Sequence, residues 1–324
     1  MTSPTLTRRG ALAALATLPF AARAQISWPA RPIRIIVAYP AGGVSDAVAR
    51  VLADRLAPVI RQPVVVENRA GASGSIGLDT VAHSAADGST FGFAAISPLT
   101  LTPHIGKSPF ERNELTPVVS VMYSPVLLLA TPATPAKDFR ELLAAAKARP
   151  GAIRWSTSGP ASLGHVMLEQ LKSAAGVDIT HVPYKGGGQQ ITDALSGQFE
   201  VLSVNSGPAV VQHMKAGKLR ALAVGAPSRL ESLPGVPTLA ELGFPAANLM
   251  STFGLFAPAA TPPVVVERMN AEVNRVLTAP DVRARLLATD NVPTGGSAAD
   301  FAKLIAQESD NNARIVKAAG IRAE

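Results

Sequence analysis

The sequence predicts an α/β protein of two lobes, each a mainly parallel β-sheet flanked by helices, with a ligand cleft between them. Three observations point to this class. Apolar runs typical of strands alternate with amphipathic helical segments, in two separate series. The chain has 324 residues, about twice the usual size of one domain. Finally, 47% of the residues are hydrophobic and only 16% are charged, a composition that favours folded domains over disorder.

The first segment, residues 1–24, has the three parts of an export signal. Two arginines at 8–9 form a basic start, an apolar run occupies 10–22, and Ala-Arg-Ala at 22–24 is a small-x-small cleavage site. The run is shorter than the ~20 apolar residues that a membrane-spanning helix needs. We therefore expect export and cleavage near Gln25, and the arginine pair is compatible with either the Sec or the twin-arginine route.

The first strand-helix series follows the leader and predicts a parallel sheet. Its opening apolar run, RIIVAY, is of strand type, and the next segment places Val48, Leu52 and Leu56 on one helical face. Two successive β-α-β crossovers bring three strands together in parallel. The expected elements are strand 34–39, helix 46–60, strand 63–66, helix 76–85 and strand 90–96.

A second series of the same layout predicts the second sheet. Its elements are strand 153–157, helix 162–175, strand 179–183, helix 188–196, strand 199–204, helix 208–216 and strand 219–224.

The segments around the second series define the domain organisation. Residues 118–130 are long and apolar, and are expected to cross from one domain to the other; the return crossing is expected between 225 and 258. Helices expected at 263–277, 282–288 and 298–319 have no sheet of their own and must cover the first sheet. We therefore expect a discontinuous domain 1 (25–125 and 226–324), a domain 2 (126–225) and a hinge.

Composition excludes several classes of function. The absence of cysteine removes thiol nucleophiles, disulfides, iron–sulfur clusters and Cys-ligated zinc. The five histidines show no metal-ligand spacing such as HExxH, and neither a metal nor a cofactor is expected. The formal net charge is +7, but the leader carries three of the arginines, and the other basic residues are scattered. A small anion is therefore a better partner than nucleic acid.

The first candidate site is the loop between the first strand and the first helix. Its glycines allow close backbone approach, and a helix N-terminus with free N–H groups binds carboxylate or phosphate. Ligands also bind beyond the carboxyl ends of parallel strands. An ordinary glycine-bearing βα loop explains the motif equally well. The candidate residues are Tyr39, Pro40, Ala41, Gly42, Gly43, Ser45 and Asp46.

The second candidate is the segment Ser156-Thr157-Ser158-Gly159-Pro160-Ala161-Ser162-Leu163-Gly164-His165. Ser162 suits a helix N-cap, and His165 falls in the first turn, where the helix dipole favours neutral imidazole. A Ser-x-x-His pair also suggests a nucleophile and base, but the G-x-S-x-G elbow is absent and the motif contains no acid. We therefore favour capping and ligand contact over catalysis.

The third candidate is His181-Val182-Pro183-Tyr184-Lys185-Gly186-Gly187-Gly188, another strand end that leads into a helix. Lys185 is interpreted as an anion ligand or as a solvated turn residue, since the phosphate-loop motif is absent. Asn205 and Ser206 end the next strand at the equivalent height. The glycine-rich connection 67–77 either lines the cleft or serves only to pack a loop against a helix.

Read in order, these segments resemble the Bug-type (TctC) receptors of tripartite tricarboxylate transporters, which are periplasmic solute-binding proteins. The resemblance covers essentially the whole mature chain. The matching text is WPARPI at 28–33, YPAGGVSD at 39–46, PVVVENRAGASG at 63–74, ADG at 86–88, SLGH at 162–165, HVPYKG at 181–186, KAGKLRALAV at 215–224, PGVPT at 234–238 and LFAPA at 255–259.

The resemblance implies a type II-like periplasmic-binding-protein fold that closes like a Venus flytrap over one small carboxylate. It also implies a periplasmic monomer without enzymatic activity, which delivers its ligand to membrane transporter subunits. Backbone amides of the βα loops in both domains would grip the ligand. Carried over, the ligand-binding residues comprise the first-loop residues given above together with Ser97, Ser158, Gly159, Ser162, His165, Tyr184, Lys185, Gly186 and Asn205.

Three positions depart from the family pattern. The family often has Asp where Asn205 stands, so ligands that carry an amine are less expected here. Val44 replaces a small polar residue, and Thr102-Pro103 replaces Asn-Pro. The sequence thus predicts a binding protein for a small organic anion; the alternatives are an exported hydrolase or lyase that uses Ser162 and His165, and a sensory binding protein.

Overall fold

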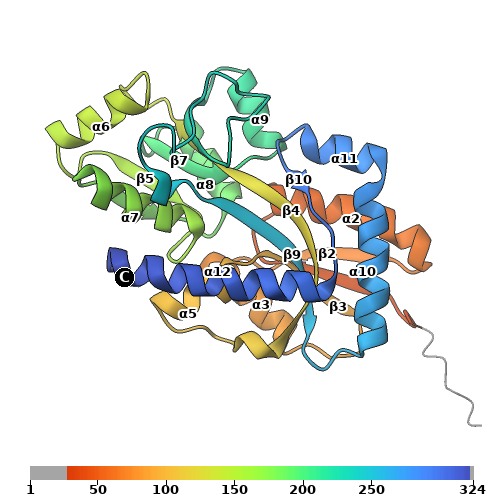
Figure 1. The fold of residues 1–324 in the computed structure, drawn as a ribbon. Coiled ribbons are helices and arrows are strands. Elements are labelled where there is room, and N and C mark those ends of the chain that lie inside the picture. The colour runs from red at the N-terminus through yellow and green to blue at the C-terminus, as the bar shows by residue number, and fades with distance from the viewer. Residues whose placement is uncertain (1–27, 322–324) are drawn as a thin grey trace, which may run out of the picture.

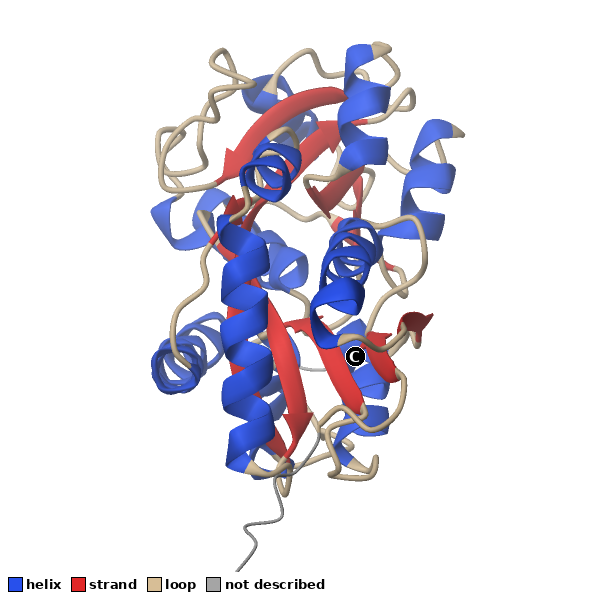
Figure 2. Ribbon diagram, turned by 90° about the vertical axis from the view of Figure 1, so that its right-hand side faces the viewer, coloured by secondary structure: helices blue, strands red, loops and turns tan. Residues whose placement is uncertain are grey.

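The computed structural model describes residues 28–321, and the predicted export signal lies outside this range. Two bodies of α/β structure lie one beyond the other, joined by long strands (Figures 1 and 2). Each body has its own cluster of buried side chains. The first core draws on residues 33–122 and 253–305, and the second core on residues 126–247. Within the described residues, no helix has the length and hydrophobicity to cross a bilayer.

The first sheet begins with three parallel strands, as the sequence predicts. β1 (Ile33–Val37) lies between β2 (Val64–Asn68) and β3 (Thr90–Ala95) and pairs in parallel with both. The crossovers are α2 (Val44–Ile60) and α3 (Ser75–Ala82), whose apolar faces enter the first core. Antiparallel pairings complete the sheet: β9 (Met250–Pro258) pairs with β3, β4 (Leu115–Ala130) with β9, and the short β10 (Val292–Pro293) with β4.

The second sheet repeats this plan. β5 (Arg154–Thr157) pairs in parallel with β6 (Thr180–Pro183) and with β7 (Val201–Asn205). The helices α7 (Leu163–Ala175), α8 (Gly187–Leu195) and α9 (Pro208–Lys215) follow these strands in turn. The last strand of the predicted series, β8 (Arg220–Gly225), pairs antiparallel with β4 rather than joining the parallel part.

Two strands cross between the bodies. β4 (Leu115–Ala130) pairs with β9 (Met250–Pro258) through Pro125, and from Val126 onward it pairs with β7 and β8 instead. One continuous strand therefore belongs to both sheets, in the region where the sequence predicts a crossing. The segment between β8 and β9 packs on the second core, through Leu239 and Ala247.

The C-terminal helices cover the first sheet, as expected. α10 (Pro263–Thr278), α11 (Pro280–Leu287) and α12 (Ala298–Ala319) supply buried residues to the first core. α12 also reaches the other body, since Val316 near its C-terminal end packs in a small cluster with Val166 of α7. In Figure 1 this long helix runs across the molecule beneath the crossing strands.

Three short helices were not predicted from the sequence. They are α4 (Ser97–Thr100), α5 (Thr102–Ile105) and α6 (Phe139–Ala148). α6 has a recognisable signal, because Asp138 accepts the backbone N–H of Glu141 as its N-cap. The remaining elements are single 3-10 turns at Ala72–Gly74, Arg112–Glu114 and Pro245–Ala247.

Candidate functional site

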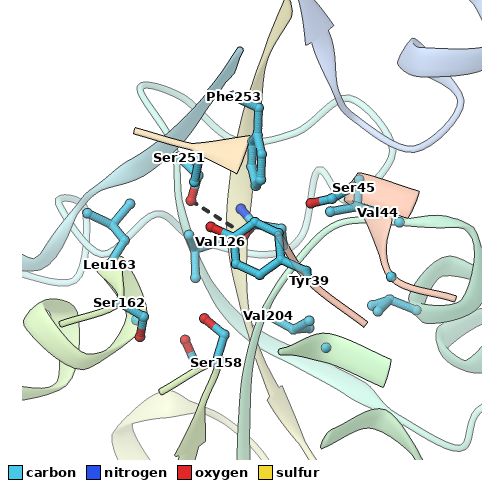
Figure 3. Close-up of a pocket in the computed structure, with 18 of the residues that line it drawn as sticks. Tyr39, Val44, Ser45, Val126, Ser158, Ser162, Leu163, Val204, Ser251 and Phe253 are labelled. Carbon is cyan, nitrogen blue, oxygen red and sulfur yellow. Dashed lines mark hydrogen bonds between the residues drawn. The ribbon is translucent and has the colours of Figure 1, made fainter. Parts of the chain in front are cut away.

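A cavity lies between the two cores, where loops from both sheets meet (Figure 3). The volume open to the centres of water molecules is about 70 Å³, enough for several waters or one small molecule. This is the scale of a small metabolite rather than of a polymer. The structure brings together eight of the residues predicted for the site: Tyr39, Gly42, Gly43, Ser45, Ser97, Ser158, Ser162 and Asn205.

The other eight predicted residues are outside the cavity lining. They support the site from behind, close it from the opposite body, or point into solvent. They are Pro40, Ala41, Asp46, Gly159, His165, Tyr184, Lys185 and Gly186.

The loop before α2 is shaped by its glycines and by Asp46. Gly42 has a φ of +82°, which favours glycine because other residues are strained in this region. Its N–H donates to the carboxylate of Asp46 (3.1 Å), which also accepts from Arg50 (2.8 Å). Burial opposes ionisation of Asp46, but the hydrogen bonds from Arg50, Gly42 and Asn68 outweigh it and lower the pKa. The Asp46 carboxylate therefore fixes the loop through Gly42, and its negative charge is paired with Arg50.

The start of α7 is held in a different way. Ser162 is the N-cap, and its Oγ accepts the backbone N–H of His165 (3.3 Å). The His165 ring is buried, with 3% of the residue exposed, and its Nδ1 accepts the N–H of Ala161 (3.3 Å). The ring stacks on His181 with centroids 4.4 Å apart. His165 thus supports the loop that presents Ser158 and Ser162 to the cavity.

His181 belongs to the same support. It is within 2.7 Å of the hydroxyl of Thr157. Burial lowers the pKa of His181 to about 4, and repulsion from His165 and then Lys172 acts in the same direction. The imidazole is neutral near pH 7.

Of the loop from Tyr184 to Gly188, only Gly187 is among the residues that line the cavity. The hydroxyl of Tyr184 donates to Asp193 (2.8 Å), and burial, followed by this carboxylate, raises the pKa of the tyrosine. Lys185 is exposed. At Gly186 a Cβ would lie 2.4 Å from Cδ of Pro40, and at Gly188 it would lie 2.9 Å from the carbonyl oxygen of Ala41. Glycines therefore allow the second body to touch the first loop.

Asn205 lines the cavity, but its amide is bonded to the crossing strands. Its Nδ2 donates to the carbonyls of Ser124 (3.2 Å) and Pro125 (3.3 Å), and its Oδ1 accepts from Ser251 (3.4 Å). The side chain thus ties β7 to β4 and β9 at the point where β4 changes partners.

Other lining residues were missed by the sequence reasoning. Ser251 and Phe253 come from β9, which the proline-rich pattern of the preceding segment concealed. Ser203 lies two residues before Asn205 on a predicted strand, so alternation along that strand was an available signal for Ser203 but not for Val204. The lining residues outside every candidate segment are Ala95, Val126, Ile191, Ser203, Val204, Gly207, Ala209, Val210, Ser251 and Phe253. Ser73, Leu163, Gly164 and Gly187 lie within candidate segments but were not singled out, and Val44 was noted only as a departure.

The electrostatics of the cavity come from the backbone. None of its lining residues carries a charged side chain. Four helices, α2, α7, α8 and α9, contribute first-turn residues to the lining. Three of them, α2, α8 and α9, begin after a glycine and have no side-chain bond at the N-cap. Helix N-termini with uncapped N–H groups carry partial positive charge and attract anions.

Metal chemistry has no counterpart in the part of the chain that the structure describes. Residues 28–321 contain no group of three or more His, Asp or Glu side chains arranged to hold a metal ion.

Comparison with known proteins gives a consistent picture. The model of the tripartite tricarboxylate transporter family receptor matches residues 48–321. Protein BugT of Bordetella pertussis is 36% identical over 301 residues, which are 91% of this chain and 91% of that protein.

Solved structures match over nearly the full length. The periplasmic binding protein BugD superposes with a TM-score of 0.86 at 27% identity, over 92% of this chain and 100% of BugD. An R. palustris protein with adipate gives 0.86 at 32% identity, covering 91% and 99% of the two chains. MatC from Rhodopseudomonas palustris with bound malate gives 0.82 at 29% identity, covering 89% and 100%. The two-lobed periplasmic-binding-protein fold is thereby confirmed.

Proposed function

The chain belongs to the tripartite tricarboxylate transporter receptor family, and we propose that it captures a small organic carboxylate in the cavity between its two cores. Related proteins have been solved with adipate and with malate. The family consists of solute-binding receptors, and the relatives described above are of this kind. The resemblance stated from the sequence is confirmed by these matches.

The observation that carries the proposal is the convergence of helix N-termini on a cavity without charged side chains. Each N-terminus contributes about half a positive charge, and the lining hydroxyls add neutral donors. A carboxylate placed here exchanges water for fixed N–H and O–H groups, with no acidic side chain nearby to repel it. We propose that Gly43, Val44 and Ser45 from α2, with Leu163 and Gly164 from α7, supply backbone donors.

A hydrolase or lyase is the weaker candidate. A catalytic Ser162 needs an adjacent base that can take its proton. The Ser162 oxygen instead accepts a backbone N–H as a helix cap, and the His165 ring packs on a second imidazole behind the loop. We infer that the protein binds its ligand without transforming it.

The cellular setting follows from the family. We propose that the protein is exported, cleaved near Gln25 and periplasmic, and that as a monomer it delivers the ligand to membrane subunits of a tripartite transporter. A sensory role would use the same site but a different partner. Intact mass of the protein recovered from the periplasm tests the cleavage, and retention of residues 1–24 would contradict it.

We propose that the two cores move as lobes about the crossing strands. Support comes from β4, which changes pairing partners between Pro125 and Val126. The segment from 226 to about 249 packs on the second core, so in this proposal the second lobe runs from 126 to about 249 and not only to 225.

The binding site itself is tested at Gly43. Its φ is −81°, and an added Cβ would meet only the carbonyl oxygen of Pro40, at 3.7 Å. The fold should therefore tolerate Gly43→Val, while the added side chain occupies space beside the α2 N-terminus. We expect at least a tenfold loss of affinity for the carboxylate identified by thermal shift, measured by calorimetric titration. Gly235→Val, where a Cβ meets nothing within 4 Å, is the matched control. If Gly43→Val binds the carboxylate as tightly as the parent, the anion does not bind at the N-terminus of α2.

A further inference from the structure

The turn between α11 and β10 belongs to the first lobe and ends the helix α11 with a regular backbone motif (Figure 1). The N–H of Asn291 donates to the carbonyl of Leu286 (3.1 Å), and the N–H of Asp290 donates to the carbonyl of Leu287 (3.0 Å). This pair of bonds is the Schellman pattern, in which one residue takes a left-handed conformation. That residue is Asp290, with a φ of +58°.

Aspartate is unfavourable at this position on local grounds. Glycine adopts a positive φ without strain and is the usual residue here. A carboxylate beside the last carbonyls of a helix also lies at the negative end of the helix dipole. Among the described residues, the Asp290 carboxylate forms no hydrogen bond within its own lobe, and both of its bonds go to the second lobe. The local cost of Asp290 is therefore offset only by contacts between the lobes.

The Asp290 carboxylate reaches two serines of the second lobe. Its Oδ1 accepts from the hydroxyl of Ser232 (2.6 Å), and its Oδ2 accepts from the hydroxyl of Ser206 (3.5 Å). The first bond is short and charge-assisted, whereas the second is long and weaker. Ser232 lies between Leu230 and Leu233, which pack against the second core. The bond to Ser232 therefore links one lobe to the other.

Asn291 adds a buried bond to the same link. Its Nδ2 donates to the carbonyl of Ser206 (3.1 Å), and neither residue is exposed to solvent. A buried carbonyl needs a donor, and here the donor comes from the other lobe. We name these four residues the clasp: Asp290 and Asn291 on the first lobe, and Ser206 and Ser232 on the second.

The clasp is connected to the cavity through α9. Ser206 is followed by Gly207, the N-cap of α9, which lines the cavity together with Val44 of the first lobe. A Cβ at Gly207 would lie 3.1 Å from the Cβ of Val44, so the two lobes are close at this point. None of the four clasp residues lines the cavity. A substitution in the clasp therefore acts on ligand binding without removing a ligand contact.

We propose that Asp290 is a positioning residue, whose side chain holds the second lobe against the first and favours the closed, ligand-binding arrangement. Separation of the lobes breaks its bonds to Ser232 and Ser206, so these bonds stabilise only the closed arrangement. A ligand that binds this arrangement binds more tightly when the closed population is larger. The inference rests on the proposed function and adds a residue that sets affinity from outside the site.

The first test replaces Asp290 by glycine, which suits the backbone and removes the carboxylate. Arg61→Gly is the matched control, because Arg61 is an exposed residue with a φ of +55° at the C-cap of α2. Both variants should melt close to the parent. Titration calorimetry uses adipate or malate, whichever binds the parent more tightly. Asp290→Gly should bind about tenfold more weakly, whereas Arg61→Gly should bind like the parent. Asp290→Asn keeps an acceptor oxygen and should recover most of the affinity.

A double-mutant cycle tests whether the effect runs through the bond between the lobes. Ser232→Ala should weaken binding several-fold in the parent. In the Asp290→Gly background it should add nothing, because both substitutions remove the same bond. Additive losses in the cycle, or parent-like or tighter binding by Asp290→Gly, would overturn the proposal.

The closed population is also measured without ligand. The chain has no cysteine, so Val65→Cys on β2 and Arg140→Cys on α6, both exposed, place one spin label on each lobe. Double electron–electron resonance should show fewer short distances between the labels in Asp290→Gly than in the parent. Identical distance distributions would overturn the clasp. Failure of the parent to bind any dicarboxylate would overturn the proposed function instead, and the label distances would still test the clasp.

Discussion

Ser162 combines two roles at one position. Its hydroxyl caps α7 by accepting from His165, and the same residue lines the cavity. Gly42 also has two roles: its positive φ shapes the loop, and its N–H donates to the carboxylate of Asp46. At both positions the residue type is required by local backbone chemistry, and the ligand surface is built on that requirement.

The two roles of Ser162 can be separated by a matched pair of substitutions. Ser162→Ala removes an N-cap and a cavity hydroxyl, and should lower stability by about 1 kcal/mol and affinity several-fold. Ser297→Ala removes the N-cap of α12, whose hydroxyl accepts the backbone N–H of Asp300 and donates to the Asp300 carboxylate, and should cost similar stability without affecting binding. Denaturant unfolding and calorimetric titration measure both. Equal affinity in the two variants would show that the Ser162 hydroxyl does not contact the ligand.

At the scale of elements, α7 and β6 are joined by stacked histidines. His165 on the helix and His181 on the strand are nearly parallel, at 8° between planes, and Thr157 on β5 contacts the second ring. Burial first, then His165 and Lys172, lower the pKa of His181 to about 4, whereas a histidine in an unfolded chain titrates near 6.5. Neutral His181, stacked on His165, supports the loop that carries Ser158 and Ser162.

This difference in pKa predicts how stability depends on pH. Between about pH 6.5 and pH 4 the unfolded chain binds a proton at His181 that the folded protein does not. The stabilisation is complete above pH 6.5 and is lost as the pH falls toward 4, by about 1–3 kcal/mol. Urea unfolding at pH 7.5, 5.5 and 4.5 should show this loss, and His181→Gln should reduce the dependence. The pKa of His83 is raised by a hydrogen bond to the backbone of Asp79 and by the charge of Asp79. Because His83 is present in both the parent and His181→Gln, its effect on stability cancels when the two pH profiles are compared. Identical pH profiles would show that the stack is not the titrating element.

At the scale of the whole molecule, the two lobes are in contact across the mouth of the cavity. Gly186 and Gly188 of the second lobe lie against Pro40 and Ala41 of the first, and Gly207 lies against Val44. The lack of a side chain at these three glycines allows the second lobe to approach Pro40, Ala41 and Val44 closely. Closure of this kind traps a ligand between rigid bodies that move about a hinge.

Gly188→Ala should separate closure from folding. The position is in the first turn of α8, where alanine favours the helix over glycine by about 1 kcal/mol. In the closed arrangement, however, its Cβ would lie 2.9 Å from the carbonyl oxygen of Ala41. We expect the unliganded protein to be no less stable than the parent, and the affinity to fall about tenfold or more. Small-angle scattering should show a smaller radius of gyration on ligand addition for the parent and for Gly235→Ala, but not for Gly188→Ala. Normal closure of this variant would show that contact at Ala41 does not limit the movement.

The sequence by itself determined much of the fold, because its patterns are local. Alternating apolar runs and helical periodicity located both β-α-β series, and the long apolar segment at 118–130 located the crossing strand. The role of Ser162 as a cap was also predicted, since capping depends on neighbours three residues away. The match of successive motifs to a receptor family was readable in the same way.

Only the tertiary structure decided which residues face the cavity. Tyr184, Lys185 and Gly186 follow a strand end as Asn205 does, yet the first three lie outside the lining and Asn205 lies within it. Ser251 and Phe253 reach the site from β9, more than 200 residues after Tyr39. No local sequence pattern predicts that these distant residues line one cavity, because this depends on how the shared strands place the two sheets relative to one another.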